Sequence, residues 1–381
     1  MNDLINDKSL NMIKYLLIIL LLTFTSVSAS EIIILPTKET DPVFSSGDAA
    51  DDPAFWYNQK DPSRSVIFGT DKKSGLHSFS LEGKRMQFIS SGKINNIDSR
   101  GGYNFGAKNF SILAGSNASN NSIIIYLINE DGIIEKLNQN EFETELESVY
   151  GLCMYKSDKS RSTYIFVSDA LTFTINQYRV LNFFPIKAQL VRQIQTETTS
   201  EGCVVDDESG VLYFAQEDEK SGVYYIDAEP TNNEITVLDK IKGNGGYING
   251  DTEGLAILNH EKGKLLIASS QGSSDFTVYD IEKGGRYLGR FSIGTNNQID
   301  GVSRTDGIEI YSGYISEDFE MGILIAQDDM NMETFELDGV SLQAKKINQN
   351  FKMIPTDQII DNFIISPKGF PLIQSILRLS F

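Results

Sequence analysis

Six positions spaced about fifty residues apart carry side chains able to hold a cation or move a proton. Five are acidic and one is a tyrosine, and the steps between them are 47, 52, 51, 52 and 53 residues. Carboxylates bind divalent cations, order water and act as general acids or bases, and a phenol can share these tasks. The six positions are Asp51, Asp98, Tyr150, Glu201, Glu253 and Asp306.

The elements that position these side chains also repeat. Each of the six positions is followed by a β-rich run that ends in small and polar residues. A period near fifty residues with several strands per period is typical of propeller blades rather than helical repeats. The sequence therefore predicts an all-β fold, a six-bladed β-propeller that forms a single domain over residues 30–381. The β-rich runs are residues 66–70, 111–115, 164–168, 212–216, 265–269 and 323–327.

The repeat has a consequence for charge. The innermost strand of each propeller blade lines a central channel, so equivalent positions approach one axis. Carboxylates held that close repel one another unless they take up protons or share a cation, and calcium or magnesium suits oxygen ligands. A ring of solvated acids at the blade ends is the alternative. Additional acids beside the repeated positions favour the metal site, namely Asp48, Asp52, Glu217, Asp218, Glu219, Asp251 and Asp300.

The overall charge excludes two classes of partner. The chain has 52 acidic and 33 basic residues and a formal net charge of -19. Such a protein has no general affinity for nucleic acid or for an anionic membrane surface. An anionic substrate would also be repelled, unless bound metal reverses the sign of the charge locally.

The two ends of the chain differ from the repeats. Residues 15–24 are apolar, follow Lys14 and precede a run of small residues, which predicts a signal peptide over residues 1–29 with cleavage after Ala29. We therefore expect an exported protein, extracellular or periplasmic, because ten apolar residues are too few for a membrane anchor. The C-terminal segment, residues 364–381, is unusually apolar, and we have no physical account of it.

The cysteines and histidines narrow the chemistry. Cys153 and Cys203 follow repeated positions in neighbouring blades, where they would form a disulfide or stay as two buried thiols that pack as small apolar groups. Oxidation is expected to be dispensable. The two histidines, His77 and His260, have no neighbouring arrangement that resembles a catalytic triad. A serine hydrolase, a histidine phosphatase and a histidine-dependent lactonase are therefore disfavoured.

Short motifs run in a fixed order along residues 39–355. The most specific is Gly-Asp-Ala-Ala-Asp-Asp-Pro-Ala-Phe-Trp at residues 47–56. On these motifs the chain resembles the β-propeller phytases, the alkaline calcium-dependent phytate hydrolases of bacteria. The other matching stretches are residues 72–76, 95–100, 149–151, 200–202, 206–208, 216–219, 251–254, 268–272, 300–301, 305–307, 326–328 and 348–353.

The resemblance implies a role for each matching residue. The family fold is a six-bladed propeller with several Ca²⁺ ions in the channel and along one rim. Lys72 and Lys73 would meet substrate phosphate, and Asp306 would order water or handle its proton. Glu201, Lys72, Asp306 and Tyr150 would be catalytic, with Tyr150 also touching substrate. Ca²⁺ ions that tie blades and chain ends together would be held by Glu39, Asp52 and Asp328. The rim Ca²⁺ ions would be held by Glu201, Glu217, Asp251, Glu253, Gln271 and Asp300, joined by Tyr150.

The same resemblance implies the reaction. The expected activity is that of a 3-phytase, a phosphomonoester hydrolase that releases inorganic phosphate from phytate, bound as its calcium complex. A water ordered by Glu201 or Asp306 would attack in line, while Lys72 stabilises the phosphoryl oxygens. We expect a neutral to alkaline pH optimum and a monomeric enzyme.

Two departures from the family pattern keep other functions open. Ala118 stands where the family usually carries an arginine that grips phosphate, and residues 167–171 lack a lysine found in some members. One alternative is a calcium-stabilised propeller with weakened or no phytase activity that acts as a ligand-binding module. Another is a propeller esterase or lactonase with a channel calcium, which the histidines disfavour.

Overall fold

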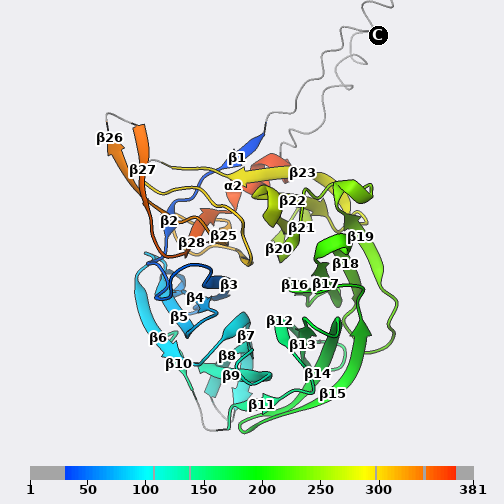
Figure 1. The fold of residues 1–381 in the computed structure, drawn as a ribbon. Helices are drawn as coiled ribbons and strands as arrows, with labels where there is room; N and C mark the ends of the chain where they lie inside the picture. Colours follow the sequence, from blue (N-terminus) through cyan, green and yellow to red (C-terminus); the bar gives the residue numbers. More distant parts are fainter. Residues whose placement is uncertain (1–30, 106–107, 137–138, 297, 338–339, 366–381) are drawn as a thin grey trace, which may run out of the picture. The chain divides into compact units, whose positions relative to one another are not determined.

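The computed structural model describes residues 31–105, 108–136, 139–296, 298–337 and 340–365. These residues form mostly strands, in six sheets arranged as a six-bladed β-propeller (Figure 1), which confirms the predicted fold. Among the helices of this described part, none has the length and apolarity needed to cross a membrane. The predicted signal peptide at residues 1–29 and most of the apolar C-terminal segment lie outside the described residues.

Blades one to five are built from consecutive antiparallel strands, and the first strand of each lies nearest the centre in Figure 1. Blade one contains β3 (Ala50–Trp56), β4 (Val66–Asp71), β5 (Gly75–Ser80) and β6 (Arg85–Ser90). Blade two contains β7 (Ile94–Phe105), β8 (Lys108–Asn117), β9 (Ser122–Ile128), β10 (Ile134–Glu135) and β11 (Glu141–Glu143). Blade three contains β12 (Val149–Lys156), β13 (Thr163–Asp169), β14 (Thr174–Phe183) and β15 (Ile186–Gln195). Blade four contains β16 (Cys203–Asp206), β17 (Val211–Gln216), β18 (Gly222–Asp227) and β19 (Thr236–Lys240). Blade five contains β20 (Thr252–His260), β21 (Gly263–Ser270), β22 (Asp275–Asp280) and β23 (Arg286–Ile293).

Blade six combines the two ends of the described chain. Its strands are β24 (Ile308–Ser312), β25 (Gly322–Asp328), β28 (Asn350–Pro355) and the N-terminal β2 (Lys38–Glu39), which pairs antiparallel with β28. The preceding strand β1 (Ile32–Ile34) pairs parallel with β23 of blade five. Backbone hydrogen bonds from the N-terminal segment therefore close the ring and bring Glu39 to the last blade.

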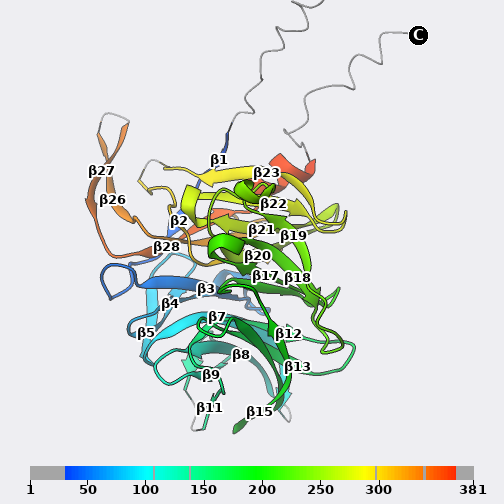
Figure 2. The same cartoon turned by 45° about the vertical axis from the view of Figure 1, so that its right-hand side comes forward.

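Two further elements belong to blade six. A two-stranded hairpin, β26 (Met332–Leu337) and β27 (Val340–Lys346), is inserted between β25 and β28 and extends away from the blade (Figure 2). A short helical segment, α2 (Asp357–Ile360) followed by a π-helical turn (Asp361–Ile365), buries Ile359, Ile360 and Phe363 against blade five.

Apolar clusters between the blades hold the ring together. Ile112 and Ile123 of blade two pack with Ile165 and Val167 of blade three, and all four are fully buried. Burial of one such side chain contributes about 1.5–3 kcal/mol relative to exposure. Because the strands are buried on both faces, they read as continuous apolar runs in the sequence. The packing fixes where each inner strand begins, and the acidic residues lie at those points.

Candidate metal centre and phosphate site

The inner strands begin with an irregularity that releases side chains from the sheet. In four blades the pairing skips two residues, between Ala50 and Pro53, Ile94 and Ile97, Val149 and Leu152, and Thr252 and Leu255. A bulge of this kind redirects a side chain and ends the regular ladder. The residues at the corresponding point in the six blades are Asp51, Asn95, Tyr150, Glu201, Glu253 and Asp306, which we call the rim positions.

The prediction that Asp98 is the second of the six repeated positions is therefore wrong. Asn95, not Asp98, takes the rim position of blade two, and its Nδ2 donates to Glu201 Oε1 at 2.5 Å. Asp98 lies further along β7, where it pairs with Arg100 and accepts a hydrogen bond from the Met154 amide at 2.8 Å. There it lines a cavity of about 1020 Å³. The spacing pattern selected the nearest acid and passed over an amide three residues earlier.

Glycines bring neighbouring rim positions together. A Cβ added to Gly151 would lie 1.9 Å from the Glu201 carbonyl oxygen, and one on Gly202 would lie 2.1 Å from that of Glu253. A Cβ on Gly254 would lie 2.6 Å from the Asp306 carbonyl oxygen. Real Cβ atoms do not come so close, so only glycine permits this backbone spacing. Each glycine directly follows a rim residue and allows the adjacent blade to lie against it.

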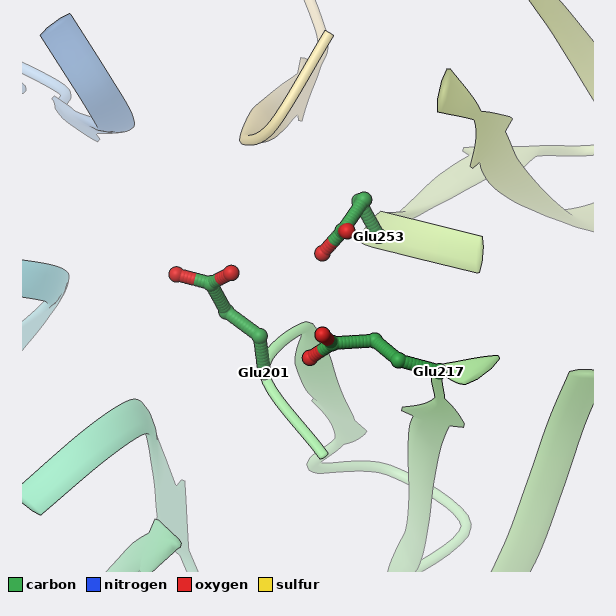
Figure 3. Close-up of side chains that lie close together, drawn as sticks. All are labelled: Glu201, Glu217 and Glu253. Carbon is green, nitrogen blue, oxygen red and sulfur yellow. The ribbon is translucent and has the colours of Figure 1, made fainter. Parts of the chain in front are cut away.

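Three glutamates form the closest group of acids. Ligand oxygens of Glu201, Glu217 and Glu253 all lie within 4.8 Å of one another. Figure 3 shows the three carboxylates directed toward a shared space, with Glu217 extending from the end of β17. Glu201 and Glu253 are 7% and 6% exposed. Three carboxylate oxygens this close together are donors that a divalent cation can use.

Burial and mutual repulsion raise the pKa values in this group. The pKa of Glu201 rises to about 7 through burial and the charges of Asp306 and Glu217. The pKa of Glu217 rises to about 7 through burial and the charges of Asp218 and Asp251, and that of Glu253 rises well above its ordinary value. Without a cation the fold therefore favours protonated glutamates at this rim.

Lys72 lies beside the glutamates and holds the remaining rim acids. Its Nζ is 2.8 Å from Asp48 Oδ1, 2.8 Å from Asp51 Oδ1 and 3.4 Å from Asp306 Oδ2. Burial lowers the pKa of Lys72, but the charges of Asp51 and Asp306 outweigh it and the net shift is upward. Gln271 Nε2 donates to Asp306 Oδ1 at 2.6 Å. The structure thus joins predicted phosphate-binding, metal-binding and catalytic residues in one network.

Tyr150 and Asp251 complete the predicted rim set. Burial raises the pKa of the Tyr150 phenol, as do the charges of Glu201, Glu217 and Glu253, so this phenol stays protonated. Asp251 is exposed and accepts the Gln271 amide on its carbonyl oxygen at 2.9 Å. Its charge is one of those that raise the pKa of Glu217.

Asp300 does not lie with the rim acids. It contacts the Nζ of Lys352, which is fully buried and also lies 2.5 Å from Glu39 Oε2 and 3.6 Å from Asp328 Oδ2. The same Nζ donates to Asn331 Oδ1 at 3.0 Å. The prediction that Asp300 joins the rim cluster is thus corrected, because the chain places Asp300 with the acids that tie the N-terminal strand to blade six.

Asp52 is separate from that second group. Its Oδ2 accepts the Ile97 amide of blade two at 2.9 Å, and its amide donates to Thr70 Oγ1 at 2.9 Å. Burial raises the pKa of Asp52 well above its ordinary value. Asp52 therefore connects blades one and two, while Glu39 and Asp328 meet at Lys352 within blade six.

The unpaired carboxylate oxygens at the rim fit a hard divalent cation. Among the described residues, three buried rim carboxylate oxygens have no hydrogen-bond partner, namely Asp51 Oδ2, Glu217 Oε1 and Glu253 Oε2. A buried acceptor left unpaired costs about 1–3 kcal/mol. An oxygen-rich site without sulfur or imidazole donors matches calcium or magnesium and not zinc.

Ala118 and the predicted phosphate-binding residue Lys73 also lie at this end of the blades. Ala118 is exposed and follows β8, whose last residue, Asn117, pairs with Ile94 directly before the rim position of blade two. Lys73 Nζ donates to the Ser46 carbonyl oxygen at 2.7 Å. Lys73 is therefore near Lys72 in the sequence but outside the network of buried acids.

The cysteines form a disulfide between β12 and β16. The alternative of two buried thiols is therefore not the state of this structure. Cys153 lies three residues after Tyr150, and Cys203 lies two residues after Glu201. The disulfide joins the inner strands that carry two predicted catalytic residues.

The comparisons with known proteins identify the family. The family model described as Phytase matches residues 8–368. A 3-phytase of Bacillus subtilis (strain 168) is 34% identical over 357 residues, which is 90% of this chain and 90% of that protein. This chain belongs to the phytase family. Among solved structures, a gluconolactonase from Xanthomonas campestris covers 87% of this chain and 93% of its own, with 12% identity and a TM-score of 0.48.

Within this phytase fold, sequence reasoning missed some functional neighbours. Asn95 was overlooked because an acid, Asp98, lies nearer to the expected step of about fifty residues, although Asn95-Asn96 repeats the paired polar residues of Asp51-Asp52. Lys352 lies in the matching stretch at residues 348–353, but no role was predicted for it. A single lysine within a buried strand such as β28 signals a paired internal cation, since unpaired lysines are almost never buried.

Proposed function

We propose that this protein is a calcium-dependent phosphomonoester hydrolase that releases inorganic phosphate from phytate. The observation that carries the proposal is the convergence of Glu201, Glu217 and Glu253, with unpaired buried oxygens, beside the ammonium of Lys72 in a member of the phytase family. Phytate is a polyanion, so a rim of carboxylates needs added positive charge to receive it.

The proposed ligands follow from the two groups of acids. Glu201, Glu217 and Glu253 would hold Ca²⁺ at the rim, with Asp251, Gln271 and Tyr150 beside them. Calcium bound there would supply the positive charge that attracts phosphate and offsets charge on the phosphoryl oxygens. Glu39, Asp300 and Asp328 remain proposed ligands near Lys352, and Asp52 remains one between blades one and two.

The chain's own side chains supply the remaining chemistry. Lys72 would donate to a phosphoryl oxygen, since its Nζ already lies among acceptors at the rim. Asp306, held by Gln271 at 2.6 Å, would orient a water and take up its proton during in-line attack. Glu201 would share that task across the rim. The phenol of Tyr150 would donate to substrate.

We also propose that the protein is exported and acts as a monomer. Cleavage after Ala29 would deliver the propeller to the periplasm or the outside of the cell. The enzyme would act as a monomer, because all the proposed site residues come from one chain. Its substrate would be phytate as the calcium complex.

A phosphate-release assay tests the proposal. The full chain, purified without added metal, should release phosphate from phytate with calcium and lose this activity when a chelator is added. Restoring excess calcium should restore the rate. Equal phosphate release with and without chelator would refute calcium dependence, and no release under any metal condition would refute the hydrolase.

Ala118 supports the second candidate, a calcium-stabilised propeller that binds phytate without turnover. Its methyl group cannot make the charge-assisted contacts of an arginine. Calorimetric binding of phytate combined with the absence of phosphate release would select this function over the first.

A further inference from the structure

In three blades, a polar residue near the end of the second strand holds the start of the inner strand beside it. Its hydroxyl accepts the backbone amide of the residue that follows the rim position. These pairs are Thr70 with Asp52 at 2.9 Å, Ser116 with Asn96 at 3.0 Å and Ser168 with Gly151 at 2.8 Å. The bonds lie where the ladder is irregular, so they fix the backbone from which a rim side chain leaves.

Blade six has a longer side chain, Gln327, at the corresponding place in β25. Gln327 is fully buried, and its backbone amide donates to the carbonyl oxygen of Gly307 at 3.1 Å. Its Oε1 accepts the backbone amide of Asp306 at 2.9 Å, and its Nε2 donates to the carbonyl oxygen of Ala50 at 3.1 Å. Gln327 therefore joins the rim residue of blade six to the residue that precedes Asp51 in blade one.

The partners of Gln327 require a side chain that both accepts and donates. The backbone amide of Asp306 can only donate, and the carbonyl oxygen of Ala50 can only accept. The two ends of the Gln327 amide group match this pair, so its orientation is fixed by its partners. A methionine would fill a similar volume but form neither hydrogen bond, and a threonine could bond to Asp306 but not reach Ala50.

The two segments that Gln327 joins carry the acids on either side of Lys72. The Nζ of Lys72 lies 2.8 Å from Asp51 Oδ1 and 3.4 Å from Asp306 Oδ2. The amide of Gly307 also donates to the Asp51 carbonyl oxygen at 3.1 Å, and a Cβ on Gly307 would lie 2.6 Å from that oxygen. The backbones of blades six and one are thus in direct contact here, and the side chain of Gln327 is a second connection between them.

We propose that Gln327 is a positioning residue for phosphate release, which holds Asp306 and Asp51 at the spacing that keeps Lys72 between them. Gln327 is fully buried, so it acts through these residues and not on the substrate. This inference rests on the proposed function, because it takes Lys72 and Asp306 as the groups that act on phosphate and water. A displacement of about 1 Å in a reacting group can slow a reaction about 100-fold, even when the cause is remote.

Steady-state kinetics of the full chain with calcium tests this role. The variant Q327M should lower kcat for phytate about tenfold to 100-fold, because Asp306 and Lys72 lose their fixed spacing. Its KM should change less than about twofold, since an interaction used in the transition state affects kcat and kcat/KM alike. Calcium affinity, measured by titration, should stay unchanged, because Gln327 does not contact Glu201, Glu217 or Glu253.

Gln177 of β14 offers a matched control. It is also fully buried and joins two blades, because its Nε2 donates to the Ala228 carbonyl oxygen at 2.7 Å and its Oε1 accepts from Arg192 Nε at 2.8 Å. Neither partner is a rim residue, so Q177M should lower the melting temperature as Q327M does and leave kcat unchanged. An unchanged kcat in Q327M, an equal loss in Q177M, or a fall in calcium affinity that accounts for the loss would overturn the positioning role.

A second variant keeps the test decisive if Q327M does not fold. Q327T puts a hydroxyl at the place where blade one has Thr70, so it keeps an acceptor for the Asp306 amide and loses the bond to Ala50. Its kcat for phytate should fall with KM unchanged, because the connection between the blades is broken while the bond within blade six remains. A kcat equal to that of the unsubstituted chain would overturn the role of this connection and leave the hydrolase intact.

A stability measurement separates this inference from the proposed function. If the unsubstituted chain releases no phosphate, thermal melts with chelator on K72M, Q327T and K72M/Q327T replace kinetics. The change in melting temperature caused by K72M should then differ between the Q327T background and the unsubstituted chain, because residues of one network do not contribute additively. The same cycle with Q177M should be additive. An additive cycle with Q327T would overturn the positioning role, whereas coupling would support it although the hydrolase had failed.

Discussion

At the scale of single residues, Glu201 belongs to the glutamate group and also contacts the rim position of blade two. It shares the glutamate group with Glu217 and Glu253, accepts from Asn95 Nδ2 at 2.5 Å, and is repelled by Asp306. Its side chain therefore belongs to the proposed cation site and lies close enough to Asp306, the acid proposed to order water, for their charges to interact. A substitution that keeps its volume and removes its charge separates function from packing.

We predict that Glu201→Gln lowers phosphate release about 100-fold or more, as loss of a preorganised charged group at a reaction site does. The metal-free variant should melt no lower than the unsubstituted protein, because one repelling buried carboxylate is gone. Phosphate release and thermal melting with chelator check both parts. The control is Glu261→Gln, in the exposed turn after β20. Near-normal turnover by Glu201→Gln would show that the rim is assigned wrongly.

Ala118 gives the second prediction at this scale. Ala118→Arg should add a bidentate, charge-assisted contact that stabilises bound phosphate by about 1.5–3 kcal/mol. The gain should appear as a lower KM for phytate with kcat changed less, because a non-reacting phosphate is bound equally in ground and transition states.

The other outcomes of Ala118→Arg are also informative. A larger change in kcat would put residue 118 at the reacting phosphate. No change in either constant would remove Ala118 from the site.

At the scale of elements, the disulfide decides between the two cysteine states that the sequence left open. Cys153 and Cys203 are 50 residues apart and join β12 to β16, next to Tyr150 and Glu201. In the chain-entropy model, closing a loop of this length stabilises the fold by ~4 kcal/mol. The earlier expectation that oxidation is dispensable assumed two free thiols.

We predict that a reductant, or the double variant C153S/C203S, lowers the melting temperature. The calcium affinity of the rim should fall with it, because the two strands would no longer be joined beside the glutamate group. Calcium titration in the presence and absence of reductant measures this effect. C153S/C203S treated with reductant is the control, since it should show no further loss. An unchanged melt would restore the view that oxidation is optional.

The elements also show which features were predictable. Period, apolar runs and motif order predicted six blades, and they brought Glu201, Glu217, Glu253, Lys72 and Asp306 to one rim. Spacing alone failed at Asn95, which follows Asp51 by 44 residues and precedes Tyr150 by 55, so an even period near fifty selected Asp98 instead. The family resemblance put Asp300 in the rim set, but Asp300 contacts Lys352 instead, because β28 pairs with the N-terminal β2 through residues more than 300 positions apart.

At the scale of the whole molecule, the acids of the channel make stability depend on both pH and metal. Burial raises the pKa of Asp51, Glu201, Glu217 and Asp306 to about 7, with help from neighbouring acids. In the unfolded chain these groups titrate near their ordinary values of about 4. The metal-free fold therefore binds more protons than the unfolded chain between about pH 4 and about pH 7.

We predict that the metal-free protein loses stability as pH rises through that window. A folded pKa that is raised gives stability below the unfolded pKa and removes it as pH climbs through the folded value, at about 1.4 kcal/mol per pH unit for each proton. Calcium binds the deprotonated acids, so its stabilising effect should grow over the same window. A hundredfold excess over Kd adds about 2.7 kcal/mol for one site.

Thermal melts with chelator and with calcium, at steps between about pH 5 and about pH 8, measure this coupling. The melting temperatures with calcium and with chelator should move apart as pH rises. In Glu201→Gln the difference should be smaller, because one titrating ligand is missing. Magnesium at equal concentration tests whether the site distinguishes the two cations by size. Parallel curves, or a melt that chelation leaves unchanged at every pH, would contradict a metal-filled rim. The raised pKa values would then reflect buried protonated acids that hold the blades together without a cation.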